Sequence, residues 1–221
     1  MAMPRAALSQ DQVDEFRDAL CAAATRLFAE HGYEGVTMRA LAKDLGCSPM
    51  TPYRYFENKA EIFETVRHAA ADRFADAIDG AVKRHERHRE RLIAMTHAYV
   101  GFALEEPDAY RIIFELDRSR RPTAVTAEET RSWFIMKAAI TEAIEAGVLQ
   151  GDPNVVAHLL WSGVHGMVAL HLAGMLSLGL DLESLVDAFI AREVENQSAG
   201  NGAAAVTDRS ISSAPETAPN D

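Results

Sequence analysis

Apolar residues recur at three- and four-residue intervals through most of this 221-residue chain, and no run alternates with a period of two. The run formed by Met38, Leu41, Ala42 and Leu45 is the most compact example, because positions i, i+3, i+4 and i+7 share one face of a helix. A half-buried strand would instead need strict alternation of apolar and polar residues. The sequence therefore predicts an all-α fold with almost no strand.

Short polar side chains mark the expected helix starts, because they can accept hydrogen bonds from the free N–H groups of the first turn. The predicted N-terminal caps are Ser9, Asn58, Thr126, Asp152 and Asp181. Glycine tolerates the left-handed conformation that ends many helices, and we expect ends at Gly32, Gly147 and Gly179. The helix opened by Asp152 would then have about 27 residues and a length of roughly 40 Å.

Two short helices are expected on either side of a three-residue turn, at 37–45 and 49–55, with the turn formed by Gly46, Cys47 and Ser48. Gly46 permits the left-handed backbone at the end of the first helix, and Ser48 can cap the second. Two helices joined in this way form a helix-turn-helix, whose second helix enters the major groove of DNA. The same spacing also occurs in helical proteins that bind no DNA, where the aromatic residues that follow would be core.

The helix-turn-helix segment is locally basic in an acidic chain. Residues 37–59 hold four basic and two acidic side chains, whereas the whole chain has a formal net charge of −11. Arg39 and Arg54 can each bond a guanine edge in two places, and Met50 can contact a thymine methyl group. Hydroxyl groups and one helix-terminal lysine can bind phosphate oxygens, and the candidates are Thr37, Thr51, Tyr53, Tyr55 and Lys59. This chemistry favours sequence-specific binding to double-stranded DNA.

Residues 9–65 resemble, in order and spacing, the DNA-binding region of TetR-type transcriptional regulators. The resemblance is carried by the string TMRALAKDLGCSPMTPYRYFENKAEIF, which spans residues 37–63. It implies an all-α homodimer whose three N-terminal helices bind operator DNA. It further implies that bases are contacted by Arg39, Pro49, Met50, Thr51 and Arg54. By the same resemblance, phosphates would be held by Thr37, Ser48, Tyr53, Tyr55 and Lys59.

Pro52 departs from the commoner family pattern, which has leucine at this position. Proline lacks an N–H and disfavours helical conformation at the preceding residue, so Met50 and Thr51 need not take the poses of the commoner pattern. The later stretches EEPDAYRIIFEL and WSGVHGMVAL resemble a C-terminal ligand-binding domain named for its Trp-His-Gly character. We therefore expect a helix-turn-helix domain at 1–57, a helical ligand-binding and dimerisation domain at 58–196, and a disordered tail at 197–221.

Aromatic and methionine side chains cluster in the second half of the chain. Mostly apolar walls with a few polar tips are typical of a small-molecule pocket, although an ordinary core has the same composition. Together with the family resemblance, the cluster predicts a pocket for a small apolar effector. The expected lining residues are Met95, Tyr99, Phe102, Phe114, Trp133, Met136, Trp161 and His165.

Two apolar helices expected at 153–179 and 182–196 suit pairing between two subunits. Small residues such as Gly163 and Gly166 allow close helix approach, so a two-fold axis could build a four-helix interface. The stretch 155–180 holds no Asp, Glu, Lys or Arg and is long enough to span a bilayer. We interpret it as a helix buried in protein, and the alternative is a helical membrane or lipid-binding protein that does not bind DNA.

No secretory leader is seen at the N-terminus, and Cys21 and Cys47 cannot form a disulfide framework, so we expect a cytoplasmic protein. His85 and His88 share a helical face, but they lie in a charged run that reads as solvated or DNA-facing. No phosphate loop, nucleophile elbow or paired carboxylates appear. The sequence therefore predicts no cofactor, no metal and no enzymatic activity.

These features combine into one expected mechanism. A homodimeric regulator, most simply a repressor, would leave its operator when a small apolar effector binds the C-terminal domain. The helix that begins after Asn58 would transmit the change, because it joins both domains. An activator role stays open, since the sequence does not say where the operator lies relative to a promoter.

Overall fold

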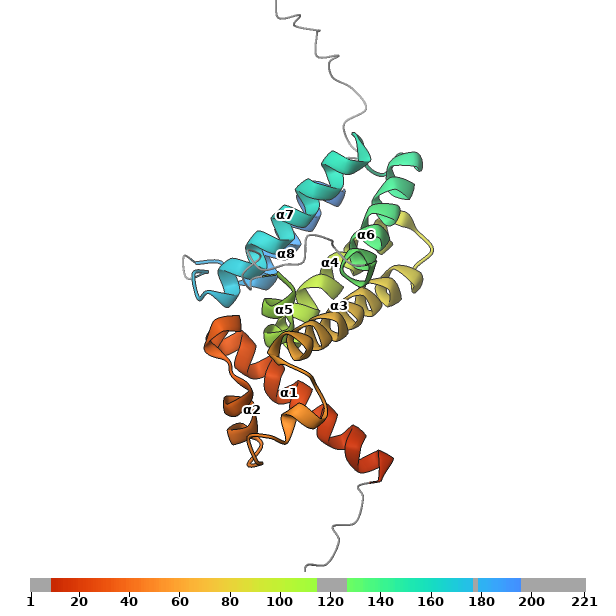
Figure 1. Cartoon of the computed structure of the whole chain (residues 1–221). Coiled ribbons are helices and arrows are strands. Elements are labelled where there is room, and N and C mark those ends of the chain that lie inside the picture. The colour runs from red at the N-terminus through yellow and green to blue at the C-terminus, as the bar shows by residue number, and fades with distance from the viewer. Residues whose placement is uncertain (1–8, 115–126, 177–178, 196–221) are drawn as a thin grey trace, which may run out of the picture.

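The computed structural model of the chain describes residues 9–114, 127–176 and 179–195, and every regular element in these ranges is a helix (Figure 1). The N-terminal part holds α1 (Gln10–Gly35), α2 (Met38–Asp44), the short 3₁₀ helix η1 (Pro52–Arg54) and the start of α3 (Lys59–Lys83). The remaining elements are α4 (His88–Glu105), α5 (Pro107–Phe114), α6 (Ala127–Glu145), α7 (Pro153–Leu172), α8 (Leu182–Ile190) and a π-helical turn, η3 (Ala191–Glu195). The prediction of an all-α fold is confirmed, and the predicted tail at 197–221 lies outside the described residues.

The helices begin where the sequence places capping side chains. Ser9 forms a reciprocal capping box at the start of α1. The Asn58 Oδ1 atom accepts from the first turn of α3 over 3.0 Å, and Asp152 and Asp181 cap α7 and α8 in the same way. These side chains satisfy backbone donors that a helix leaves unpaired at its N-terminus. The fifth predicted cap, Thr126, lies outside the described residues.

Two of the predicted helix ends, at Gly32 and Gly147, coincide with a glycine of positive φ at or near the end of a helix. Gly32 has φ of +70° and interrupts α1 shortly before its last turn, which ends at Gly35. Gly147 has φ of +73° and follows α6, which ends at Glu145. Both positions use the left-handed region that glycine enters without steric cost.

The end of α7 differs from the prediction. The helix stops at Leu172, after 20 residues, because Gly174 takes φ of +69° and the Met175 N–H donates back to the Leu170 carbonyl over 2.9 Å. Gly179 also has a positive φ, but it lies beyond the helix and does not end it. The helix is therefore about 30 Å long, shorter than the sequence predicts.

Two apolar cores share one long helix. The N-terminal core is built from α1, α2 and the segment up to Phe56, and α3 adds Ile62 and Val66 to it. Farther along, α3 contributes Phe74 and Ile78 to the larger core of the second half. The N-terminal core thus extends past the predicted boundary between residues 57 and 58, and α3 belongs to both halves.

The short helix α5 also serves both cores, and Figure 1 shows it at the junction above α1. Ile112 is 1% exposed and packs into the N-terminal core, whereas Tyr110 is fully buried in the second core. Directly before α5, the Glu106 carboxylate accepts three hydrogen bonds from Arg73 of α3, at 2.7, 3.0 and 3.3 Å. The position of α5 is therefore fixed by side chains from both halves.

Candidate DNA-binding surface and core cavity

The turn after α2 is formed by backbone geometry and capping. Thr37 Oγ1 accepts a hydrogen bond of 3.1 Å from the first turn of α2. At the other end, Gly46 has φ of +64°, and the Cys47 N–H donates to the Ala42 carbonyl over 2.9 Å. A side chain at position 46 would strain this turn, because only glycine enters the left-handed region freely. The chain thus reverses sharply and presents the following residues at the surface.

The segment after the turn is more tightly wound than the sequence predicts. The prediction of an α-helix over 49–55 is wrong, because the structure has a turn followed by η1. Most of the segment's backbone bonds span three residues, as those from Arg54 to the Thr51 carbonyl and from Tyr55 to the Pro52 carbonyl do, each over 3.0 Å. Pro52 itself has no N–H to donate, and only at the end of the segment does a four-residue bond form, from the Phe56 N–H to the Pro52 carbonyl over 3.1 Å. The segment is still right-handed, but its side chains point in directions different from those on an α-helix.

The residues predicted to contact bases lie at the surface. Met50 is 67% exposed, although methionine is among the residue types most often buried. The other candidates are exposed or half-buried, and they are Arg39, Pro49, Thr51 and Arg54. Met50 offers an apolar contact for a thymine methyl, and Arg39 and Arg54 offer forked donors for guanine edges.

The residues predicted to hold phosphates differ in how they are supported. The hydroxyls of Thr37 and Ser48 accept from backbone N–H groups, at 3.1 and 3.4 Å. A hydroxyl that accepts still has its own proton to donate to a phosphate oxygen. Tyr53 is 49% exposed, whereas the ring of Tyr55 is half-buried and stacks on Phe16 of α1 with 4.6 Å between ring centroids.

Lys59 makes internal contacts that the sequence does not reveal. Its Nζ donates to the Tyr33 carbonyl over 2.7 Å and lies 4.1 Å from the centroid of the Tyr33 ring. Its side chain is 23% exposed. An ammonium group has three N–H donors, so one internal bond leaves donors for a phosphate. Lys59 therefore joins the first turn of α3 to the end of α1 at the edge of the same surface.

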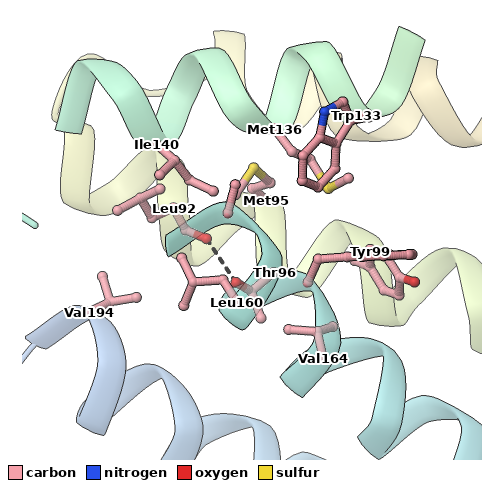
Figure 2. A pocket seen from close by; sticks show the side chains of 12 residues that line it. Leu92, Met95, Thr96, Tyr99, Trp133, Met136, Ile140, Leu160, Val164 and Val194 are labelled. Carbon is pink, nitrogen blue, oxygen red and sulfur yellow. Dashed lines mark hydrogen bonds between the residues drawn. The ribbon is translucent and has the colours of Figure 1, made fainter. Parts of the chain in front are cut away.

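A small apolar cavity lies in the second core between α4, α6 and α7, as Figure 2 shows. Its volume is about 30 Å³, enough for one or two water molecules. Pockets for small-molecule ligands usually measure about 300–1,000 Å³. Among the described residues, no Asp, Glu, Lys, Arg or His lines this cavity. An effector larger than water can enter only if wall side chains move, and a charged group would find no counter-charge there.

Five of the eight predicted pocket residues line this cavity, namely Met95, Tyr99, Trp133, Met136 and Trp161. The other three lie beside it: Phe102 and Phe114 pack edge-on against Phe74, and His165 lies behind Tyr99. The other lining residues are not predicted from the sequence, and they are Leu92, Thr96, Ile140, Ala157, Leu160, Val164 and Val194. Such residues on a buried helix face carry no signal that separates a cavity wall from ordinary core.

Three polar groups meet beside the cavity, one each from α4, α5 and α7. His165 Nδ1 lies 2.7 Å from the Tyr110 hydroxyl and 3.1 Å from the Tyr99 hydroxyl, and the two hydroxyls are 3.3 Å apart. Burial raises the pKa of Tyr99 to about 12, while hydrogen bonds to Tyr110 and Trp161 act in the opposite direction. We refer to Tyr99, Tyr110 and His165 as the polar cluster.

One face of α7 carries an apolar stripe that the described residues leave exposed. Val155, Leu159 and Leu170 are 56%, 66% and 42% exposed, and Ser162 and Gly166 lie between them on the same side of the helix. With a mean hydropathy of 1.4, α7 is long and apolar enough to cross a membrane, and 28% of its most apolar stretch is buried. Within one chain, only part of the surface of α7 is buried. The prediction that 155–180 is a helix buried in protein is therefore confirmed for that part alone.

The basic run 83–91 lies at the end of α3 remote from the helix-turn-helix. With 25 residues, α3 is about 37 Å long, so this run is far from the candidate DNA-binding surface. Several of its cations pair internally, including Lys83 with Asp79 over 2.6 Å and Arg91 with Glu142 over 2.7 Å. No group of three metal-ligating side chains occurs among the described residues.

Comparison with known families identifies both halves. Residues 20–66 match the family described as bacterial regulatory proteins, tetR family, and residues 92–192 match the tetracyclin repressor-like C-terminal domain. The HTH-type transcriptional activator FasR of Mycolicibacterium smegmatis is 27% identical over 157 residues, which are 71% of this chain and 69% of FasR. The HTH-type transcriptional repressor AcnR of Corynebacterium diphtheriae is 32% identical over 71 residues, which are 32% of this chain and 37% of AcnR.

Solved structures share the fold. A TetR family transcription regulator from Marinobacter aquaeolei VT8 superposes with a TM-score of 0.65 at 23% identity, covering 81% of this chain and 98% of that one. The arrangement of a helix-turn-helix part and a helical second part is therefore common to both proteins.

Proposed function

Because the chain belongs to the TetR family of transcriptional regulators, which bind DNA and are not enzymes, we propose that it reads a specific operator with residues 37–59. The observation that carries this proposal is the exposure of Arg39, Met50 and Arg54, which lie before and after the turn of the helix-turn-helix in the chain. Bases would be contacted by these three residues with Pro49 and Thr51. Phosphates would be held by Thr37, Ser48, Tyr53, Tyr55 and Lys59.

The tight winding of η1 bears on which bases are read. In a 3₁₀ helix, residues three apart eclipse one another, whereas in an α-helix they are offset along one face. Thr51 and Arg54 would therefore address neighbouring positions on the DNA. The operator should accordingly differ from those of relatives that have leucine in place of Pro52.

The working unit in this proposal is a homodimer. The uncovered stripe on α7 supports it, because Val155, Leu159 and Leu170 would be buried against the same stripe of a second copy. Small residues at 162 and 166 would let the two helices approach closely. The two recognition segments would then read half-sites about 34 Å apart, or a modest multiple of that spacing.

Burial of the apolar stripe of α7 against a second copy of the chain also offers an alternative to insertion of this helix into a membrane. The match to a C-terminal regulator domain covers residues 92–192 and so includes the whole helix. A regulator that must reach chromosomal DNA acts in the cytoplasm, and we propose that location. The earlier alternative of a membrane or lipid-binding protein without DNA binding does not fit membership of this family.

The proposed effector is a small, uncharged, largely apolar molecule that binds at the cavity between α4, α6 and α7. The uncharged wall supports this choice, because burying an unpaired charge there would be costly. The two methionines of the wall, Met95 and Met136, have flexible side chains that can re-pack around an occupant. The Tyr99 hydroxyl is the place where one polar group of the effector could be recognised.

Effector binding would favour a state in which the DNA-binding parts of the two subunits lie at a different distance from each other. The change would be transmitted through α3, which belongs to both halves of the chain. A full switch between bound and released operator requires about 5.5 kcal/mol of differential binding, so a weaker effector would only attenuate the response. The simplest regulator of this kind is a repressor. FasR is named an activator and AcnR a repressor, so the sign of regulation depends on where the operator lies.

The test uses a duplex selected from a random DNA pool by the full-length protein. Uncharged apolar compounds and their carboxylate analogues are then screened for release of that duplex. Release by the uncharged member of a pair but not by its charged analogue is expected. Release only by charged compounds would contradict the proposed effector class, and a protein that selects no duplex would contradict the proposed function.

A further inference from the structure

The polar cluster connects three helices in an otherwise apolar core. Tyr99 comes from α4, Tyr110 from α5 and His165 from α7, and all three interatomic distances lie between 2.7 and 3.3 Å. Buried polar groups are costly unless they are paired. The hydrogen-bonded groups of the cluster therefore link α4, α5 and α7 to one another.

The cluster touches the cavity on one side. Tyr99 belongs to the cavity wall and to the cluster, and Trp161 of the wall lies 5.8 Å from the His165 ring, centroid to centroid. The cavity has only about 30 Å³, so an occupant must displace wall side chains before it fits. Since packed interiors transmit such displacements, Tyr99 and Trp161 would pass them directly to the cluster.

On its other side the cluster reaches the N-terminal core. Tyr110 is fully buried, and two residues later Ile112 packs among the residues of the N-terminal core. Ile112 comes from the second half of the chain and yet is 1% exposed in that core. A movement of α5 that follows Tyr110 therefore changes the packing beneath α1 and α2.

We propose that the polar cluster is the coupling element of the effector site, and that it carries cavity occupancy to the DNA-binding part through α5. This inference rests on the proposed effector site and adds a second route beside α3. Filling the cavity displaces Tyr99, Tyr110 follows its partners, and Ile112 moves within the N-terminal core. The pairing of Tyr110 with His165 is the step on which the route depends, because it joins α5 to α7.

A cavity-filling substitution can stand in for the unidentified effector. Ala157 lines the cavity and is 2% exposed, so Ala157→Met places extra volume where an occupant would bind. Tyr110→Phe deletes the hydroxyl of the cluster and keeps the ring. Thr96→Val is the matched control, because the Thr96 hydroxyl lies in the same wall but bonds to the Leu92 carbonyl of its own helix over 3.0 Å (Figure 2).

The experiment is amide hydrogen exchange on the full chain, without DNA or effector. Ala157→Met should speed exchange about fivefold over 107–114 and 20–28. In the Tyr110→Phe background the same substitution should change exchange over 20–28 by less than about twofold, and in the Thr96→Val background the full effect should remain. Ala157→Val, a smaller insertion, repeats the series if the methionine variant does not fold.

Equal effects of the filling substitution in the wild-type and Tyr110→Phe proteins would overturn the proposal. So would an effect confined to the cavity wall in every background, or loss of the effect in the Thr96→Val control. The exchange readout involves no duplex, so it can fail while operator binding is intact. Conversely, a protein that binds no duplex could still show the coupling, and the two failures are therefore distinguishable.

Discussion

The ammonium group of Lys59 lies 4.1 Å from the centroid of the Tyr33 ring and donates to the Tyr33 carbonyl over 2.7 Å. This contact joins the start of α3 to the end of α1, beside the proposed phosphate contacts. One side chain therefore contributes to the fold of the N-terminal part and to its proposed surface. Its removal should be visible in two independent measurements.

Lys59→Ala should lower the free energy of unfolding by about 1–2 kcal/mol, because a charge-assisted hydrogen bond and a cation–π contact are lost. It should also reduce the slope of log K for DNA binding against log salt by about 0.9, the value for one phosphate contact. Thermal unfolding and DNA titrations over a salt series measure the two effects. Lys83→Ala, with the same charge change at the far end of α3, should leave the slope unchanged. A wild-type slope in Lys59→Ala would remove that residue from the phosphate contacts.

Arg39→Ala should lose about 1–3 kcal/mol of discrimination between the operator and a shuffled duplex, because a forked donor to a base edge is removed. The measurement is the ratio of the two dissociation constants at one salt concentration. Arg87→Ala is the control, since this residue lies at the start of α4, beyond the far end of α3, and its side chain is 83% exposed and carries the same charge. An unchanged ratio in Arg39→Ala would show that this residue contacts no base.

Pro52→Leu should change which operator is preferred more than how tightly DNA in general is bound. Leucine restores a backbone N–H, so the segment after Ser48 can form α-helical bonds in place of the three-residue bonds of η1. Duplex selection with the variant should yield a different consensus, while the salt slope stays near that of the wild type. The same consensus from both proteins would mean that the winding of η1 does not set specificity.

Gly163→Ala should destabilise the protein by about 1–3 kcal/mol, because overpacking in a core is costly. A Cβ at this position of α7 would lie 2.6 Å from Cε2 of Phe189 on α8. Gly80→Ala on α3 is the control: its added Cβ meets nothing within 4 Å, so the variant should be as stable as the wild type or slightly more stable. Urea unfolding of both variants tests the close packing of α7 on α8, and equal stabilities would contradict it.

Stability should fall at high pH because of Tyr99. Burial raises the pKa of this phenol from 10.0 to about 12 in the folded chain. Below the unfolded pKa the phenol is neutral in both states and contributes nothing, whereas between pH 10 and about 12 only the unfolded state releases the proton, so unfolding becomes easier as pH rises. Urea unfolding across this range should show a smaller loss for Tyr99→Phe than for the wild type. Equal losses would mean that Tyr99 titrates normally.

The sequence predicts the helix starts well because their signals are local. Four predicted N-terminal caps are found at the start of α1, α3, α7 and α8, and they are Ser9, Asn58, Asp152 and Asp181. The end of α7 is harder to predict, because Gly174 and Gly179 both take a positive φ and no charged residue lies between them in the sequence. The winding of residues 49–55 is not predicted from the sequence. The sequence shows that Pro52 departs from the commoner family pattern, but it does not show that a 3₁₀ helix forms there.

The cavity and the polar cluster depend on contacts between distant parts of the chain. Aromatic and methionine residues mark the region, but which of them line the cavity depends on how α4, α6 and α7 pack. The pairing of Tyr110 with His165 joins residues 55 positions apart. The spacing of residues within α5 or α7 does not predict this pairing. It does not predict either that Ile112 packs into the N-terminal core.

The most direct measurement of the central hypothesis is selection of bound duplexes from a random pool by the purified full-length protein, followed by titration of the winning duplex and a shuffled one. We expect a consensus of two inverted half-sites, one protein dimer per duplex and an affinity at least about 10³-fold above that for the shuffled duplex. No enriched consensus, or equal affinities for the two duplexes, would contradict the assignment of residues 37–59 as a sequence-specific DNA-reading surface.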